Sequence, residues 1–239
     1  MGITPYEARD MKIHPDRTAL VLIDLQDNSI ESADWPVHDY GRVAQNSSKI
    51  LAAARDAKME IAHVALEFEP DAYSIPPHLP RVAAPTHVED LTDAISTEVS
   101  PLPGEAVFLK AYRSAFFETG LHAHLVSRGV DTLVIGGVWT DACIFASVID
   151  AVRAGYKVIL AEDALGTQTA GMHQVAIVNM ANRLYQGMIS NTDAICAAVK
   201  AKCDLEGWAF SRAIEFAYEV DTVKSFYDEI VSQFPRANS

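Results

Sequence analysis

The chain has 239 residues, of which 49% are hydrophobic and 21% charged, and its formal net charge at pH 7 is −13. This composition is typical of a globular protein that can bury a substantial core without disulfides or metals. The acidic balance argues against a broad surface for nucleic acid or anionic membrane, so we expect a small molecule as the partner instead.

The cysteines and the apolar segments indicate a reducing location. Cys143, Cys196 and Cys203 form an odd and widely spaced set, which does not predict a disulfide framework. No CxxC motif or Cys/His cluster suggests a structural zinc site. The first residues lack the apolar core of a signal peptide, and no apolar stretch approaches the roughly 18 residues of a membrane span. We therefore expect a cytoplasmic protein.

Short apolar runs alternate with segments of helical periodicity along most of the chain. The apolar runs predict six strands, at residues 17–25, 60–68, 106–110, 131–138, 156–163 and 187–190. The helical segments are expected at residues 43–57, 119–129, 143–154, 172–185 and 191–202. This alternation predicts an α/β protein, a three-layer α/β/α sandwich with a six-stranded, mainly parallel sheet.

Two regions stand outside this alternation. The proline-rich residues 70–103 are expected to cross the carboxyl edge of the sheet, where α/β proteins place their ligands. The aromatic, amphipathic residues 205–234 are expected to be helical and to pack either on their own domain or against another subunit. We therefore expect residues 1–239 to form a single domain with a helical C-terminal extension from about residue 205.

Three polar residues stand at or just beyond the ends of predicted strands. Asp24 closes the first strand, Lys110 closes the third, and the turn after the fourth leads to Cys143. Taken alone, each has an ordinary structural interpretation: a helix cap, a solvated strand end and a buried packing residue. Because the carboxyl ends of parallel strands meet at one edge of a sheet, we expect the three side chains to converge on one crevice.

Such a convergence would support attack by the thiol on a carbonyl group. The pKa of a free thiol, about 8.5, must fall to supply thiolate, and we expect the following helix N-terminus and the Lys110 ammonium group to lower it. Asp24 can accept the thiol proton and return it to a leaving amine. Free backbone N–H groups in the turn can stabilise the oxyanion that develops on the carbonyl.

Three blocks of the sequence resemble the isochorismatase-like cysteine hydrolases. The blocks are LIDLQD at 22–27, LKAYRSAFFETGL at 109–121 and GVWTDACIFASVIDAVRAGYKVILAEDA at 137–164. The superfamily includes nicotinamidases, N-carbamoylsarcosine amidohydrolase, ureidoacrylate and biuret amidohydrolases, and isochorismatase. The third block is the most specific, and the resemblance runs from about residue 17 to about residue 200.

The resemblance implies a catalytic triad and an oxyanion hole. Asp24 would be the general base and acid, Lys110 the electrostatic partner and Cys143 the nucleophile. A cis peptide bond is implied between Val138 and Trp139, which would aim the backbone N–H groups of Trp139 and Cys143 into the oxyanion hole. A homodimer or homotetramer is also implied.

The chain departs from two branches of this superfamily. True isochorismatases lack the cysteine, so Cys143 argues against that activity. Nicotinamidases carry a DxH-type metal site after the second strand, whereas His63 lies within that strand here and no DxH follows it. We expect neither a catalytic metal nor any other cofactor.

These features predict a cysteine amidohydrolase. It would cleave a C–N bond of a small linear amide, urea or N-carbamoyl compound through a thioester acyl-enzyme and release ammonia or an amine. The candidate substrate-binding residues are Trp35, Tyr112, Arg113, Phe116 and Trp139. For all except Trp139, core packing or an ion pair is an equally good interpretation. Gln168 and His173 follow the fifth strand and are assigned no role.

Three other functions stay open at this point. One is a nicotinamidase-like hydrolase of an aromatic amide. The second is a non-catalytic α/β binding module, in which the three strand-end residues meet by coincidence. The third is a redox-responsive protein that uses Cys143, with Cys196 or Cys203 as a resolving partner. A screen for ammonia release separates the hydrolases from the other two.

Overall fold

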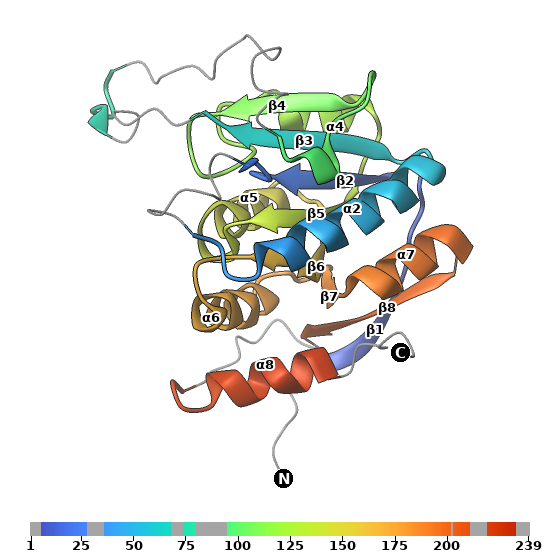
Figure 1. Cartoon of the computed structure of the whole chain (residues 1–239), viewed down its shortest axis with the longest axis vertical. Helices are drawn as coiled ribbons and strands as arrows, with labels where there is room; N and C mark the ends of the chain where they lie inside the picture. Colours follow the sequence, from blue (N-terminus) through green and yellow to red (C-terminus); the bar gives the residue numbers. More distant parts are fainter. Residues whose placement is uncertain are drawn as a thin grey trace.

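The computed structural model describes residues 6–27, 36–67, 74–79, 95–201, 203–210 and 219–232. Their strands form one eight-stranded sheet in the order β1-β8-β7-β6-β5-β2-β3-β4 (Figure 1). The strands β2 to β7 are parallel to one another. At one edge β8 pairs antiparallel with β7, and β1 pairs antiparallel with β8.

All six predicted strands are present in the parallel part of the sheet. They are β2 (Thr18–Ile23), β3 (Glu60–Leu66), β4 (Ala106–Lys110), β5 (Thr132–Val138), β6 (Lys157–Gly166) and β7 (Met188–Ser190). Every residue of β2 and β5 is buried. A strand covered on both faces has no polar side, which is why these segments appear in the sequence as continuous apolar runs.

The expected count of six strands is wrong, because β1 (Tyr6–Lys12) and β8 (Asp204–Phe210) extend the sheet. These two strands pair along their whole length, from Tyr6 opposite Phe210 to Lys12 opposite Asp204. The residues from 205 were expected to be helical, but burial there alternates: Leu205, Gly207 and Ala209 are buried. A period of two is that of a strand. The helical part, α8 (Val223–Ser232), begins later.

Helices cover both faces of the sheet and complete the predicted three-layer sandwich. Their bounds are α2 (Tyr40–Asp56), α4 (Leu121–Ser127), α5 (Phe145–Arg153), α6 (Ala170–Ala181) and α7 (Thr192–Ala201). The helices α2 and α7 lie side by side on one face (Figure 1) and share one hydrophobic core. The helices α4, α5, α6 and α8 contribute to the core on the other face.

The strand order places a switch point between β2 and β5. From β2 the chain continues outward to β3 and β4, and from β5 it continues outward to β6 and β7. In α/β proteins, loops that leave two such adjacent strands run in opposite directions, and ligands bind in the crevice between them. Among the described residues, no helix is long and apolar enough to cross a membrane.

Candidate active site

Asp24 follows the last residue of β2 and is held in an uncommon backbone conformation. Its φ angle is 56°, in the left-handed region that few non-glycine residues adopt. The backbone N–H of Asp24 still donates to the carbonyl of Val64 at 2.8 Å, so the residue remains tied to β3. Its side chain is completely buried. The carboxylate is thus fixed at the carboxyl edge, beside the switch point.

Lys110 is the last residue of β4, and its long side chain brings the ammonium group to Asp24. Because β3 lies between β4 and β2, the side chain has to pass the carboxyl end of β3. Its Nζ lies 2.9 Å from Asp24 Oδ2 and donates to the carbonyl of Tyr112 at 3.1 Å. Lys110 is completely buried. It is therefore an internal cation and not a solvated strand end.

Cys143 joins these two residues from the turn after β5. The Val138–Trp139 peptide bond is cis, and Thr140–Ile144 form the short π-helix η3, which continues into α5. The Sγ atom of Cys143 accepts a hydrogen bond from Lys110 Nζ at 3.4 Å, and the residue is 2% exposed. The three strand-end residues therefore meet in one buried cluster, with Lys110 between the acid and the thiol.

Gly137 allows β5 to approach β2 just before this turn. Its φ angle is 125°, and a Cβ atom at this position would lie 2.0 Å from the carbonyl oxygen of Ile23, the residue before Asp24. No side chain fits there. The neighbouring Gly136 is less constrained, since its Cβ would come no closer than 3.4 Å to Leu22. Gly137 is thus the glycine that keeps Asp24 close to residues 139–144, which we call the nucleophile turn after the role predicted for Cys143.

Burial is the largest single influence on the pKa of each residue in the cluster. It raises the pKa of Asp24, and Lys110 opposes this only in part. Burial disfavours the charge of Lys110, but the adjacent Asp24 and Cys143 leave its pKa above the ordinary value. Burial and the Asp24 carboxylate raise the pKa of Cys143 to about 12. The expected lowering of the thiol pKa is therefore wrong, because the cost of a buried thiolate beside Asp24 exceeds the stabilisation by Lys110.

Asp24 retains capacity to accept a proton. Its contact with Lys110 is an ion pair at 2.9 Å, but within the described part of the chain neither carboxylate oxygen has a hydrogen bond of good geometry. A buried carboxylate without full hydrogen bonding is more basic than one in water. It can therefore take the proton of Cys143.

Of the two tryptophans predicted to bind substrate, Trp139 lies directly before η3, which carries Cys143. It is half-buried, packs against the hydrophobic cores of both faces and precedes η3. Its indole Nε1 is buried and, as far as the structure describes the chain, has no hydrogen-bond partner. Trp35 lies outside the described residues.

The residues predicted after β4 face different surroundings. Tyr112 is buried, and its ring packs edge-on against Phe117 with centroids 5.0 Å apart. Phe116 is half-buried and packs against Tyr156, with ring centroids 5.8 Å apart. These contacts favour the packing interpretation of both aromatic residues. Arg113 is exposed.

His63 contacts a carboxylate near the opposite end of the sheet. Its Nε2 lies 2.9 Å from Oε2 of Glu105, and burial lowers its pKa. Among the described residues, no group of three or more His, Cys, Asp or Glu side chains is arranged to hold a metal. Residues 68–73, where a nicotinamidase-type motif would begin, lie outside the described residues.

Sequence reasoning missed a set of polar contacts behind the nucleophile turn. The hydroxyl of Thr140 lies 2.9 Å from Nδ1 of His173, whose Nε2 lies 2.9 Å from Oε1 of Glu162. Tyr227 donates its hydroxyl to the same oxygen of Glu162. The only signal in the sequence was a histidine on the helix after the fifth predicted strand.

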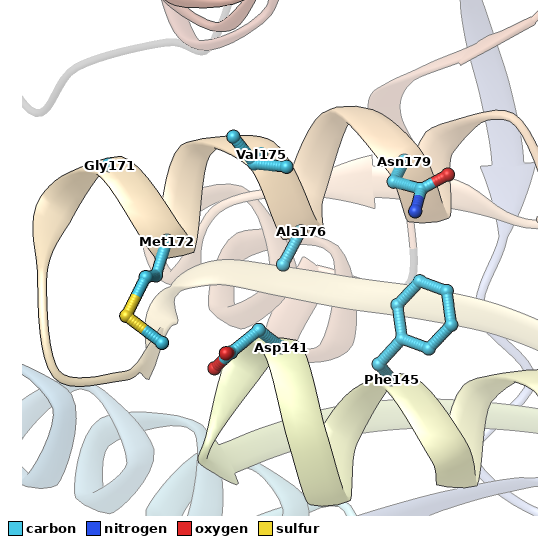
Figure 2. A pocket seen from close by; sticks show the side chains of 7 residues that line it. All are labelled: Asp141, Phe145, Gly171, Met172, Val175, Ala176 and Asn179. Carbon is cyan, nitrogen blue, oxygen red and sulfur yellow. The ribbon is translucent and has the colours of Figure 1, made fainter.

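Two cavities lie near the turn, and neither is lined by the three clustered residues. One of 490 Å³ runs between Asp141 and Phe145 on one side and Met172 and Val175 of α6 on the other (Figure 2). The other, of 280 Å³, includes His173, Glu162 and Tyr227 in its lining. The nucleophile turn is thus flanked by open space on its α6 side.

Comparisons with known proteins show which proteins this chain resembles. The maleamate amidohydrolase of Pseudomonas putida is 30% identical over 186 residues, which cover 75% of this chain and 85% of that protein. A ureidoacrylate amidohydrolase of Rhizobium rhizogenes is 24% identical over 225 residues, covering 84% and 91%. An isochorismatase family protein of Burkholderia thailandensis has the same fold, with a TM-score of 0.66 at 22% identity, covering 80% of this chain and 100% of that one.

The family assignment rests on the part of the chain that builds the cluster. Residues 18–193 match the isochorismatase domain, a span that includes Asp24, Lys110 and Cys143 together with all six parallel strands. This match spans more than half of the chain, and the chain belongs to the isochorismatase family.

Proposed function

We propose that this protein is a cysteine amidohydrolase that cleaves the C–N bond of a small linear amide, urea or N-carbamoyl compound. The observation that carries the proposal is the position of Lys110 Nζ, 2.9 Å from the Asp24 carboxylate and 3.4 Å from the Cys143 sulfur, in a buried cluster. A base, a cation and a nucleophile within reach of one another are what thiol-mediated acyl transfer requires. The two amidohydrolases described above, which are relatives of this chain, support the same reaction class.

In the first half of the proposed reaction, Cys143 attacks the substrate carbonyl. Asp24 takes the thiol proton as the C–S bond forms, and Lys110 compensates the negative charge that passes between them. The carbonyl oxygen becomes an oxyanion, to which the backbone N–H groups of Trp139 and Cys143 donate. Amides in the first turn of a helix lack acceptors within that helix, so Cys143 N–H is suited to this role. Collapse breaks the C–N bond, and Asp24 delivers its proton to the leaving nitrogen.

In the second half, water replaces the amine. The acyl group is now a thioester on Cys143, and the protonless Asp24 can activate a water molecule to attack it. The C–S bond breaks, the carboxylic or carbamic acid leaves, and the proton that Asp24 took from water returns to sulfur. The net change is hydrolysis of one C–N bond, with ammonia or an amine and an acid as products.

The covalent intermediate gives the direct test. We expect Cys143→Ala and Cys143→Ser to lose at least about 10³-fold in turnover, because both remove the thiol nucleophile. The substrates to screen for ammonia release are maleamate, ureidoacrylate, biuret, N-carbamoyl amino acids, nicotinamide and simple amides. Acid quenching during turnover, followed by peptide mass spectrometry, should find the acyl group on Cys143.

The other two cysteines are matched controls. Cys196 is half-buried and Cys203 exposed, and neither touches the cluster, so Cys196→Ala and Cys203→Ala should retain turnover. Hydrolysis that survives Cys143→Ala would overturn the covalent mechanism. Turnover of nicotinamide alone would favour the aromatic-amide alternative, and no turnover of any compound would favour a binding module.

A further inference from the structure

A buried chain of hydrogen bonds connects the nucleophile turn to the C-terminal helix. It runs from Thr140 in η3 through His173 in α6 to Glu162 in β6, and it ends at Tyr227 in α8. Thr140 is 0% exposed, and His173 and Glu162 are each 7% exposed. The ring of Tyr227 also packs edge-on against that of His173, with centroids 5.8 Å apart. Four elements that are distant in sequence thus meet at one histidine.

Glu162 determines which nitrogen of His173 carries the proton, and therefore how His173 bonds to Thr140. Contacts with His173 and Tyr227 outweigh the effect of burial and hold the pKa of Glu162 below its ordinary value, so its carboxylate only accepts. His173 must therefore carry its proton on Nε2. In the neutral imidazole, Nδ1 is then an acceptor and the Thr140 hydroxyl donates to it. Glu162 in this way orients the ring, and the ring orients Thr140.

Thr140 lies where it can transmit the orientation of the His173 ring to the backbone of Trp139 and Cys143. It is the first residue of η3, follows Trp139 directly and precedes Cys143 by three positions. The next residue, Asp141, accepts a hydrogen bond from the hydroxyl of Thr167, so two successive side chains of η3 are tied to α6 and to the segment that precedes it. Figure 2 shows Asp141 facing the side chains of α6 across the 490 Å³ cavity. These polar contacts therefore help to hold the turn on the side that faces the cavity.

We propose that His173 is a positioning residue, which acts through Thr140 to hold the backbone N–H groups of Trp139 and Cys143 in line with the substrate oxyanion. The inference rests on the proposed amidohydrolase function. His173 does not touch the reacting atoms, and its effect is on the geometry of the oxyanion hole. A displacement of about 1 Å in such a site can cost on the order of 100-fold in rate.

Two substitutions at His173 separate this role from simple packing. The amide of Asn reaches the position of Nδ1, so His173→Asn can keep the contact with Thr140 while leaving Glu162 without its histidine. The longer His173→Gln reaches the position of Nε2, so it can keep Glu162 and lose Thr140. We expect kcat to be higher for Asn than for Gln, and thermal stability to be higher for Gln than for Asn. A purely structural role would rank both quantities in the same order.

The matching pair at Thr140 tests the other end of the contact. Thr140→Val keeps the shape and removes the hydroxyl, whereas Thr140→Ser keeps the hydroxyl. We expect Val to lower kcat by about 10- to 100-fold with little change in KM, and Ser to stay within about threefold of wild type. The substrate is the member of the amide panel above that the wild-type enzyme turns over fastest.

Alkylation of the thiol provides a readout that does not depend on hydrolysis. Iodoacetamide reacts with Cys143 without forming an oxyanion, so its rate should stay within about twofold of wild type in Thr140→Val. Equal kcat for Thr140→Val and wild type would overturn the inference, and so would parallel loss of turnover and alkylation. If the wild-type enzyme turns over no amide at all, the proposed function fails and this inference fails with it.

Discussion

Burial and the neighbouring Asp24 raise the pKa of Cys143, so we expect its thiol to keep the proton until a substrate is bound. The same burial makes Asp24 a stronger base than a carboxylate in water. Under the proposed mechanism, we therefore expect the proton to be transferred during attack, without a preformed thiolate and ammonium pair. Lys110, whose pKa is raised, would stay positively charged and compensate for the negative charge as it leaves the Asp24 carboxylate.

This assignment predicts the pH dependence of turnover. Asp24 must be ionised to act as a base, and its raised pKa places the acid limb of kcat/KM above pH 3.8, with activity lost as the pH falls through that limb. Since the thiol pKa is about 12, no rise in activity should accompany thiol ionisation near pH 8 to 9.

The measurement is a kcat/KM profile from about pH 4 to pH 10 with one substrate. The difference in absorbance at 240 nm between wild type and Cys143→Ala should reveal no thiolate at pH 8. A profile that follows a group titrating near 8.5, accompanied by thiolate absorbance, would contradict this assignment and support a preformed thiolate.

The positions of the three clustered residues could be predicted from the sequence, but their ionisation could not. Asp24, Lys110 and Cys143 follow from strand ends, because parallel strands bring their carboxyl ends to one edge whatever covers them. Their pKa values depend on how completely other segments exclude water from that edge. Strand periodicity carries no information about this covering, so the thiol was expected to be more acidic than it is.

At the scale of elements, the nucleophile turn depends on the close packing of β5 against β2. Gly137→Ala would place a Cβ atom 2.0 Å from the Ile23 carbonyl at a φ angle of 125°. We expect the backbone to shift, with a loss of about 3 kcal/mol or more in the free energy of unfolding and a large fall in kcat.

Gly136→Ala is the matched control for this substitution. It lies one residue earlier in the same strand, its φ is not positive, and its Cβ would make only an ordinary contact with Leu22. We expect its free energy of unfolding to stay within about 1 kcal/mol of wild type. Urea denaturation and turnover of both variants check the pair. Equal stability of the two would show that the close approach of β5 and β2 does not matter.

Strands and helices could be predicted where the local sequence pattern determines them. They could not be predicted where they depend on pairing with a distant segment. The parallel strands and their helices follow from apolar runs and helical periodicity. The edge strands β1 and β8 instead pair residues that are far apart in the sequence, from Tyr6 with Phe210 to Lys12 with Asp204. The series of hydrogen bonds from Thr140 to Tyr227 also depends on distant pairing. The sequence of α6 or of α8 alone does not show that these two helices are in contact.

In the whole molecule, the two ends of the sheet hold two separate groups of polar residues. The carboxyl end holds the buried cluster at β2, β4 and η3. Near the other end, Glu105 just before β4 binds Arg55 at the end of α2 through two contacts, of 2.7 and 2.9 Å, and also lies 2.9 Å from His63 of β3. From Glu105 to Lys110 the strand spans about 16 Å. Substitutions near Glu105 should therefore affect stability separately from catalysis.

Glu105 provides the test of this separation. Burial alone would raise its pKa, but hydrogen bonds from Arg55, the Leu102 N–H and His63 outweigh burial and lower it to about 2. A carboxylate whose pKa is lowered in the folded state contributes stability above its ordinary pKa of 4.5, and that contribution is lost as the pH falls from there to about 2. Glu105→Gln should cost about 2 kcal/mol in the free energy of unfolding at pH 7, and the difference from wild type should shrink between about pH 4.5 and pH 2.

The same variant should keep the kcat of the wild type at 25 °C, because none of its contacts reaches the buried cluster. Asp228→Asn is the control for loss of an exposed ion pair, since Lys224 and Asp228 face solvent on α8, and it should change stability by less than about 0.5 kcal/mol. Urea titrations at several pH values measure the first effect, and initial rates measure the second. If Glu105→Gln lowers kcat while the variant is fully folded, the two ends of the sheet are coupled. If its loss of stability does not depend on pH, the charge of the Glu105 carboxylate is not what stabilises this end of the sheet.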